Sequence, residues 1–464
     1  MRMYKTKGWL LSAALLALLG GTEAQAQKAN VSKPNIIIIM TDQQTADAMS
    51  NAGNKDLHTP AMDKLAANGT RFTRAYCAQP LCTPSRSSIF SGKMPHESGF
   101  SGNAPEMDGQ WPDSVLMMGK IFKNGGYKTG YVGKWHLPIP AGKIEQHGFE
   151  TIQNTATGDY TDAATPSYCA NFIKKNKNNP FLLVASFLNP HDICEWARGD
   201  YLKMDLIGSP PDPSLCPVMP KNWKISPNEP EIIREQQKVN LRTYPTIGWT
   251  ESQWRQYRWA YNRLVEKVDD YVGMILGSLK KHGLEDNTII IFTSDHGDGY
   301  GAHEWNQKQV LYEESAKVPF IISKIGHWKP KTDDQLLCNG IDIIPTICGY
   351  AGIETPAYLK GVDLKKRMDN PKVSLRDTLV IETDFADNEV MLGIKGRAVL
   401  TKDFKYIVYD KGKIREQLFD LKNDPGEMNN LAVKSTHKAK LNQMREYLKK
   451  WCIEHQDSFY ALKK

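Results

Sequence analysis

The stretch Asn35-Ile36-Ile37-Ile38-Ile39-Met40-Thr41-Asp42 decides the fold class. Its apolar part is continuous and rich in isoleucine, which is typical of a strand buried on both faces of a parallel sheet. The run ends in Thr41 and Asp42, so polar groups follow the carboxyl end of the strand. Ligands of doubly wound α/β sheets bind outside the carboxyl ends of the strands. We therefore expect a buried strand of an α/β sheet that presents a functional carboxylate.

Three more apolar runs end in the same way. They are residues 127–132 before Gly133-Lys134-Trp135-His136, 181–187 before Asn189-Pro190-His191-Asp192, and 288–293 before Ser294-Asp295-His296-Gly297. Helical patterns lie between them, most clearly over residues 251–282 and from Thr59-Pro60 to 67, and a run at 318–322 closes the series. This alternation predicts a doubly wound sheet with helices on both faces and polar residues gathered at one edge.

The pattern changes near residue 376. Short strand-like runs at 379–382, 396–401, 406–409 and 417–421 precede a helical pattern at 437–452, which indicates a small antiparallel sheet packed with a helix. We expect a large α/β domain over 27–370 and a small α+β domain over 371–464. Residues 193–250 are too long for a simple connection. Their Trp196, Trp223 and Trp249 could form a substrate wall or pack as core and lid residues.

The first 26 residues read as a signal peptide. Arg2, Lys5 and Lys7 precede the apolar run 9–19, and Ala24-Gln25-Ala26 offers a cleavage site. The alternative is a membrane anchor, but eleven apolar residues are too few to span a bilayer. We expect a secreted or periplasmic protein without a stable membrane anchor. Cleavage lowers the net charge from +7 to +5, and no basic run or stacked-aromatic motif indicates nucleic acid binding.

The eight cysteines are scattered and include no C-x-x-C pair, so a zinc site of that type is not indicated. An exported chain can form disulfides. Cys194 with Cys216, and Cys338 with Cys348, are locally plausible pairs, and the sequence leaves the choice open.

Cys82-Thr83-Pro84-Ser85-Arg86 carries the chemistry. Pro84 suits a first helical position, which would put Cys82 just before a helix N-terminus. Backbone N–H groups there favour an anion or a thiolate. The residues by themselves indicate a reactive cysteine at an anion site, against the alternative of a packed or disulfide-bonded cysteine.

This stretch resembles the C-x-P-S-R signature of type I, formylglycine-dependent sulfatases of the alkaline-phosphatase-like superfamily. The resemblance extends over essentially the whole mature chain. It includes the opening strand, the three strand-end motifs quoted above and the ending Leu-Phe-Asp-Leu-Lys-Asn-Asp-Pro-Gly-Glu at 418–427. It implies a large mixed β-sheet sandwiched by helices, with a smaller C-terminal α+β domain.

The resemblance also implies a mechanism. A maturation enzyme converts the cysteine, here Cys82, to the aldehyde formylglycine, whose hydrate has two hydroxyls. One attacks the sulfur of the sulfate ester, and the other then expels sulfate and regenerates the aldehyde. A plain serine or cysteine would remain trapped as a stable sulfated residue.

Further roles follow from the resemblance. Arg86 steadies the hydrate, Lys134 and Lys308 bind the sulfate oxygens, His191 is the acid for the departing oxygen and His136 the base for the second hydroxyl. Several such positive charges in a preorganised site can dominate the rate.

The same resemblance implies one divalent cation, held by Asp42 and Asp295. Hard oxygen ligands favour Ca²⁺, with Mg²⁺ as an alternative. Many sulfatases have Asp-Asp where this chain has Asp42-Gln43, and Asp-Asn where it has Asp295-His296. Gln43 still offers a carbonyl oxygen, whereas His296 offers a softer nitrogen.

We therefore expect a sulfuric ester hydrolase, with a carbohydrate substrate suggested by export and analogy. One alternative is a formylglycine-dependent phosphonate monoester or phosphodiester hydrolase. Another is a non-catalytic sulfoglycan-binding protein, but Cys82 with both lysines and both histidines speaks against it, because a binder needs no nucleophile.

Overall fold

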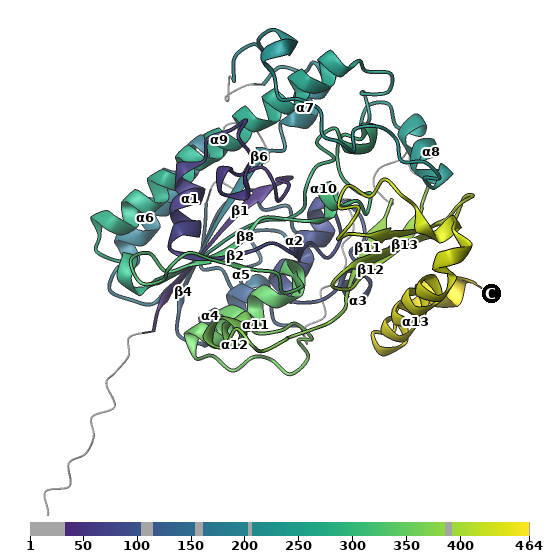
Figure 1. Ribbon diagram of the computed structural model, residues 1–464. Helices are drawn as coiled ribbons and strands as arrows, with labels where there is room; N and C mark the ends of the chain where they lie inside the picture. The colour runs from purple at the N-terminus through teal and green to yellow at the C-terminus, as the bar shows by residue number, and fades with distance from the viewer. Residues whose placement is uncertain (1–32, 104–114, 154–160, 203–206, 386–391, 464) are drawn as a thin grey trace, which may run out of the picture. The chain divides into compact units, whose positions relative to one another are not determined.

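Figure 1 shows the computed structural model, which describes residues 33–103, 115–153, 161–202, 207–385 and 392–463. All of these belong to one compact unit, Lys33–Lys464. The predicted signal peptide, residues 1–26, lies outside the described residues. Within the described ranges, no helix combines the length and the apolar character needed to cross a membrane.

An eight-stranded mixed sheet forms the centre of the fold. Its strand order is β5-β4-β6-β1-β7-β8-β2-β9, and the four strands β4, β6, β1 and β7 run parallel. β8 pairs antiparallel with β7, which makes the sheet mixed, as expected. The strands are β1 (Asn35–Asp42), β2 (Gly69–Phe72), β4 (Lys128–Gly133), β5 (Thr151–Gln153), β6 (Phe181–Pro190), β7 (Thr288–Ser294), β8 (Phe320–Ser323) and β9 (Lys331–Asp333).

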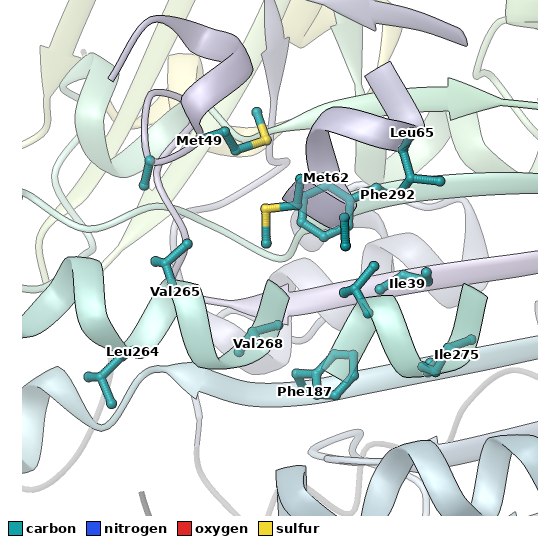
Figure 2. Packing of buried hydrophobic residues seen from close by; sticks show 14 of the residues in the cluster. Ile39, Met49, Met62, Leu65, Phe187, Leu264, Val265, Val268, Ile275 and Phe292 are labelled. Carbon is teal, nitrogen blue, oxygen red and sulfur yellow. The ribbon is translucent and has the colours of Figure 1, made fainter. Parts of the chain in front are cut away.

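The isoleucines of β1 explain why this strand is central. Ile37 and Ile39 point to one face of the sheet, where they pack against α1 (Pro60–Ala67), α6 (Thr161–Asn176) and α9 (Glu251–Lys281). Figure 2 shows Ile39 among side chains of α1 and α9, including Met62 and Val268. A fully buried aliphatic side chain stabilises the fold by roughly 1.5–3 kcal/mol. If polar residues alternated with the isoleucines, one face of the strand would lose this stabilisation.

The other face of β1 carries Ile36, Ile38 and Met40. These pack in a second cluster with side chains of four helices: α2 (Cys82–Ser91), α4 (Met118–Asn124), α11 (Asn339–Ala351) and α12 (Leu364–Asp369). Helices therefore cover both faces of the sheet, which confirms the predicted architecture. This packing holds α2 against the sheet and places its first residue, Cys82, at the carboxyl ends of the strands.

The C-terminal part forms an antiparallel sheet of β11 (Leu379–Asp384), β12 (Lys395–Leu400), β13 (Phe404–Tyr409) and β14 (Glu416–Asp420). Helix α13 (Lys438–Glu454) packs on one face through Leu441, Met444 and Leu448. The other face packs against Trp305 and Tyr312. The predicted small α+β region is therefore present, and the boundary at residue 370 stays a prediction.

The remaining elements are short. They are strands β3 (Ala75–Tyr76) and β10 (Leu337–Cys338); helices α3 (Pro95–Ser98), α5 (Ile144–His147), α7 (Ile193–Arg198), α8 (Glu231–Val239) and α10 (Glu313–Ala316); and seven 3₁₀ helices: η1 (Ser50–Ala52), η2 (Pro213–Leu215), η3 (Glu285–Asn287), η4 (Ala302–Glu304), η5 (Leu431–Val433), η6 (Ser435–His437) and η7 (Ser458–Lys463).

The long excursion after β6 supplies packing against α9. Trp196, Trp223 and Trp249 are partly buried against the cluster around that helix, and the Trp249 ring lies 5.5 Å from the Trp254 ring. These contacts support the packing alternative for the three tryptophans and not the substrate wall.

All eight cysteines are free thiols and buried. The pairs Cys194–Cys216 and Cys338–Cys348 are therefore not disulfides in this structure. Cys194 instead contacts the Gln43 amide, and Cys216 lies against the carbonyls of Pro211 and Asp212. Spacing in the sequence does not show whether two cysteines form a disulfide, because Cys194 and Cys216 pack in separate surroundings.

Candidate active site

The four predicted strand ends meet at one edge of the sheet. Asp42 ends β1, Lys134 follows β4, His191 follows β6 and Asp295 follows β7. Because β4, β6, β1 and β7 are neighbours, these side chains are brought together from widely separated parts of the chain. Gly133 makes the turn after β4: its φ is 101°, and a Cβ there would lie 1.8 Å from the Ser186 carbonyl oxygen.

Helix α2 begins two residues earlier than expected. Cys82 is the first helical residue, and Pro84 is the third. The helix tolerates this because the first N–H groups have no intrahelical acceptor, so Pro84 removes no bond. The first such bond runs from Ser85 N to the Leu81 carbonyl, at 3.0 Å.

Positive groups surround the Cys82 sulfur. Lys308 Nζ lies 3.0 Å from Sγ, His296 Nε2 3.2 Å and Lys134 Nζ 3.9 Å. Burial would raise the pKa of this thiol, but the charges of Lys134 and Lys308 outweigh it and hold the pKa well below its ordinary value. The position therefore stabilises an anion.

Arg86 bridges the two carboxylates. Its Nη2 lies 3.1 Å from Asp42 Oδ2, and its Nε lies 2.7 Å from Asp295 Oδ2. Its Nη1 donates to the Lys134 carbonyl and the Ser186 hydroxyl. All of the guanidinium is buried, so these bonds fix its place one turn into α2.

Asp42 and Asp295 form a donor set suited to a hard cation. One ligand atom each from Asp42, Cys82, Asp295 and His296 lies within 4.8 Å of the others. Burial and the neighbouring Asp42 charge raise the pKa of Asp295 to about 7. A divalent cation between the two carboxylates would favour their ionised forms, so these residues fit such an ion.

Gln43 and His296 both lie at this cluster. Gln43 has a φ of 70°, and its side-chain oxygen accepts from Lys308 Nζ at 3.0 Å. Its amide nitrogen donates to Asp298 Oδ2, which fixes the oxygen toward the site. His296 Nδ1 donates to the Gly297 carbonyl at 2.9 Å, which directs Nε2 toward the site.

The two histidines flank the cluster. His136 has a φ of 45°, and its side chain interacts with Cys82. Burial lowers the pKa of His136, so the ring is neutral near pH 7. His191 is partly exposed, with Nδ1 3.8 Å from Glu195 Oε2. All ten predicted site residues thus gather around Cys82 or at the edge of its surroundings.

A pocket beside Lys308 contains residues that the sequence did not indicate. It is lined by Asn103, His191, Cys194, Arg198, Thr243, Tyr244, Gln307, Lys308 and Gln309. Thr243 and Tyr244 belong to the long segment 193–250, but none of the three tryptophans of that segment lines this pocket. No motif indicated the loop residues of this lining, which are Asn103, Thr243, Tyr244, Gln307 and Gln309.

Comparison with known proteins decides the family. The family model described as Sulfatase matches residues 34–353. A second, described as N-sulphoglucosamine sulphohydrolase, C-terminal, matches residues 301–454.

The chain belongs to the sulfatase family. It is therefore a sulfuric ester hydrolase, and the alternative of a non-catalytic binding protein is set aside. The predicted family and enzyme class are confirmed.

Several relatives resemble this sulfatase over nearly their whole length. It is 28% identical to a Delta 4,5-hexuronate-2-O-sulfatase of Bacteroides thetaiotaomicron, over 96% of this chain and 93% of the relative. It is 30% identical to an ulvan-active sulfatase of Formosa agariphila, over 98% of this chain and 89% of the relative. The solved structure of a 2-O GAG sulfatase superposes with a TM-score of 0.81 at 27% identity, covering 93% of this chain and 94% of that chain.

Proposed function

We propose that this sulfatase removes sulfate from a sulfated carbohydrate, with Cys82 acting in its formylglycine form. The observation that carries the proposal is the convergence of Lys134, Lys308 and His296 on the Cys82 sulfur. The carbohydrate class is supported by the relatives, two of which are named for hexuronate and ulvan substrates. A maturation enzyme would form the aldehyde.

Lys134 and Lys308 would bind the sulfate group. Both ammonium groups lie on the sulfur that marks the reacting position, one from the end of β4 and one from the loop after η4. One positive charge about 4 Å from an oxyanion contributes about 4 kcal/mol at an effective dielectric constant of about 20. In the unmodified protein, Cys82 and Asp42 raise the pKa of Lys308, although burial opposes this.

His191 and His136 would transfer the protons. His191 is partly exposed and lines the pocket beside Lys308, where a leaving group would sit. It would donate a proton to the departing oxygen. His136 interacts with Cys82, and its neutral ring can accept the proton of the second hydroxyl.

Asp42, Asp295, Gln43 and His296 would hold one divalent cation, which we take to be Ca²⁺. The ion would supply positive charge beside position 82. Arg86 would keep both carboxylates in place through the contacts described above. We further propose cleavage of residues 1–26, a secreted or periplasmic location, and domain limits of 27–370 and 371–464.

The reaction class can be tested with matched substrates. We expect a higher kcat/KM for an aryl sulfate than for the phosphonate monoester with the same leaving group. A sulfate ester offers three terminal oxygens to Lys134, Lys308 and His296, whereas a phosphonate monoester offers two and a P–C substituent. Defined sulfated saccharides, assayed by sulfate release, would then identify the sugar. Faster turnover of the phosphonate would favour the phosphonate hydrolase alternative.

Chelation should stop turnover of the mature enzyme, and added Ca²⁺ or Mg²⁺ should restore it. Without the ion, two buried carboxylates face one another and the charge beside position 82 is lost. Aryl sulfate hydrolysis measures the effect. An Asp42→Asn, Asp295→Asn variant should not respond to added metal, whereas the exposed control Asp270→Asn should behave as wild type. Full activity of the double variant would refute a metal-dependent site at these residues.

A further inference from the structure

A second cluster of ligand-type side chains lies away from Cys82. His303 belongs to η4, Glu314 to α10, and Glu427 ends the motif at 418–427. One nitrogen or oxygen of each lies within 4.8 Å of the others. The cluster therefore joins η4 and α10, which follow β7, to the turn after β14 that contains Glu427.

The His303 side chain is fully buried, and both ring nitrogens lack a hydrogen-bond partner among the described residues. Its ring stacks on Tyr312 with centroids 4.0 Å apart. A buried polar group without a partner destabilises the folded state. Glu314 Oε2 is likewise without a partner within the described ranges, while Oε1 accepts from Asn222 at 2.8 Å. Such groups point to a bound ligand.

The charges around the cluster favour a cation. Glu313, Glu314 and Glu427 contribute three carboxylates, and the fully buried Lys405 pairs with two of them. Its Nζ lies 3.0 Å from Glu313 Oε1 and 2.9 Å from Glu427 Oε1. One ammonium group faces three carboxyl groups here, and a divalent ion would add the positive charge that their ionised forms need.

Other nearby cations are already paired. Arg234 donates to the His303 carbonyl, but its guanidinium bonds Glu229 through two nitrogens at 2.6 and 2.9 Å. Lys317 lies 3.9 Å from Asp47. Lys317 also compensates Glu313, whose pKa it lowers, which leaves Glu314 and Glu427 as the carboxylates available to an ion.

We propose that His303, Glu314 and Glu427 bind a divalent transition-metal ion of the Zn²⁺ type. One nitrogen and two carboxylates suit Zn²⁺ better than the all-oxygen set that Ca²⁺ prefers. Bonds of about 2.1 Å place the ligand atoms of a tetrahedral site about 3.4 Å apart, so the side chains would rotate inward to close the shell. Glu314 lines a surface pocket whose walls carry both acidic and basic side chains, and this pocket gives the cluster access to solvent. The ion would clamp the turn after β14 to α10 and η4.

The test uses Zn²⁺ alone and a chain in which the catalytic ligands are removed. The Asp42→Asn, Asp295→Asn protein is loaded with Zn²⁺, dialysed and analysed for bound metal. We expect one retained equivalent of Zn²⁺ and a higher Tm than without metal. Adding His303→Gln should abolish both effects, whereas adding His327→Gln, at an exposed histidine, should leave both.

Glu314→Gln gives a second probe, because this partly exposed residue is less critical for folding than His303. It should also lose the retained Zn²⁺. If the double variant does not fold, the same measurement is made on the wild-type protein. The wild-type protein should then retain one more equivalent of Zn²⁺ than the His303→Gln variant. No retained Zn²⁺ in folded protein, which would indicate a buried water only, overturns the proposal. The proposal is also overturned if neither His303→Gln nor Glu314→Gln changes the amount of Zn²⁺ that the protein retains. Either outcome leaves the catalytic assignment untouched, because the catalytic ligands are absent or constant.

Discussion

Replacing Cys82 with serine should abolish repeated turnover and leave one sulfate group on the protein. A serine hydroxyl beside Lys134 and Lys308 can attack sulfur, since the charges that bind the sulfate remain. It has no second hydroxyl to expel the sulfate, so each molecule reacts at most once. Wild-type protein matured in a competent host should instead turn over many times.

Mass analysis of tryptic peptide 75–86 checks this prediction and carries its own control. The peptide contains both Cys77 and Cys82. In active wild-type protein, position 82 should be an aldehyde and Cys77 a thiol, because only Cys82 is followed by the C-x-P-S-R pattern. In the serine variant, position 82 should gain the mass of a sulfate. Unmodified Cys82 in fully active protein, or repeated turnover by the variant, would contradict the proposed nucleophile.

Replacing His191 with alanine should slow hydrolysis of a sugar sulfate by ~10²–10⁴-fold, with a much smaller loss on a nitrophenyl sulfate. A sugar alkoxide is a poor leaving group and needs a proton from the acid. A nitrophenolate hardly needs one. The ratio of the two kcat/KM losses is the measurement, and the exposed His58→Ala is the control.

The His136→Ala variant distinguishes the two histidines. If His136 takes the proton of the second hydroxyl, this variant should accumulate sulfated protein at position 82 with either substrate. A purely structural role predicts equal losses on both substrates, a lower Tm and no trapped adduct. Equal losses for His191→Ala in well-folded protein would remove it from the acid role.

The agreement between the sequence and the site has a physical origin. Four long apolar runs can be buried only as strands covered on both faces, and parallel neighbours bring their carboxyl ends to one edge. Asp42, Lys134, His191 and Asp295 each follow such a run directly, so their common location could be predicted. Their catalytic roles stay predictions until the variants are measured.

Other features could not be derived from the sequence. The edge strands β5 and β9, and strand β2 beside β9, have three or four residues each, too few for a periodicity to show. The start of α2 was misplaced by Pro84, because proline is tolerated anywhere in the first turn. Free thiols at Cys194 and Cys216 likewise depend on packing, which spacing does not report.

The sequence by itself determined the family, the nucleophile motif and the edge of the sheet at which polar groups gather, because these depend on local patterns in the chain. Only the tertiary structure decided which distant groups touch. Lys308 reaches Cys82 across 226 residues, and the resemblance indicated its role but not this contact. His303, Glu314 and Glu427 come from three separate segments and share one buried space. Such contacts arise from the packing of whole elements, whose geometry no local pattern encodes.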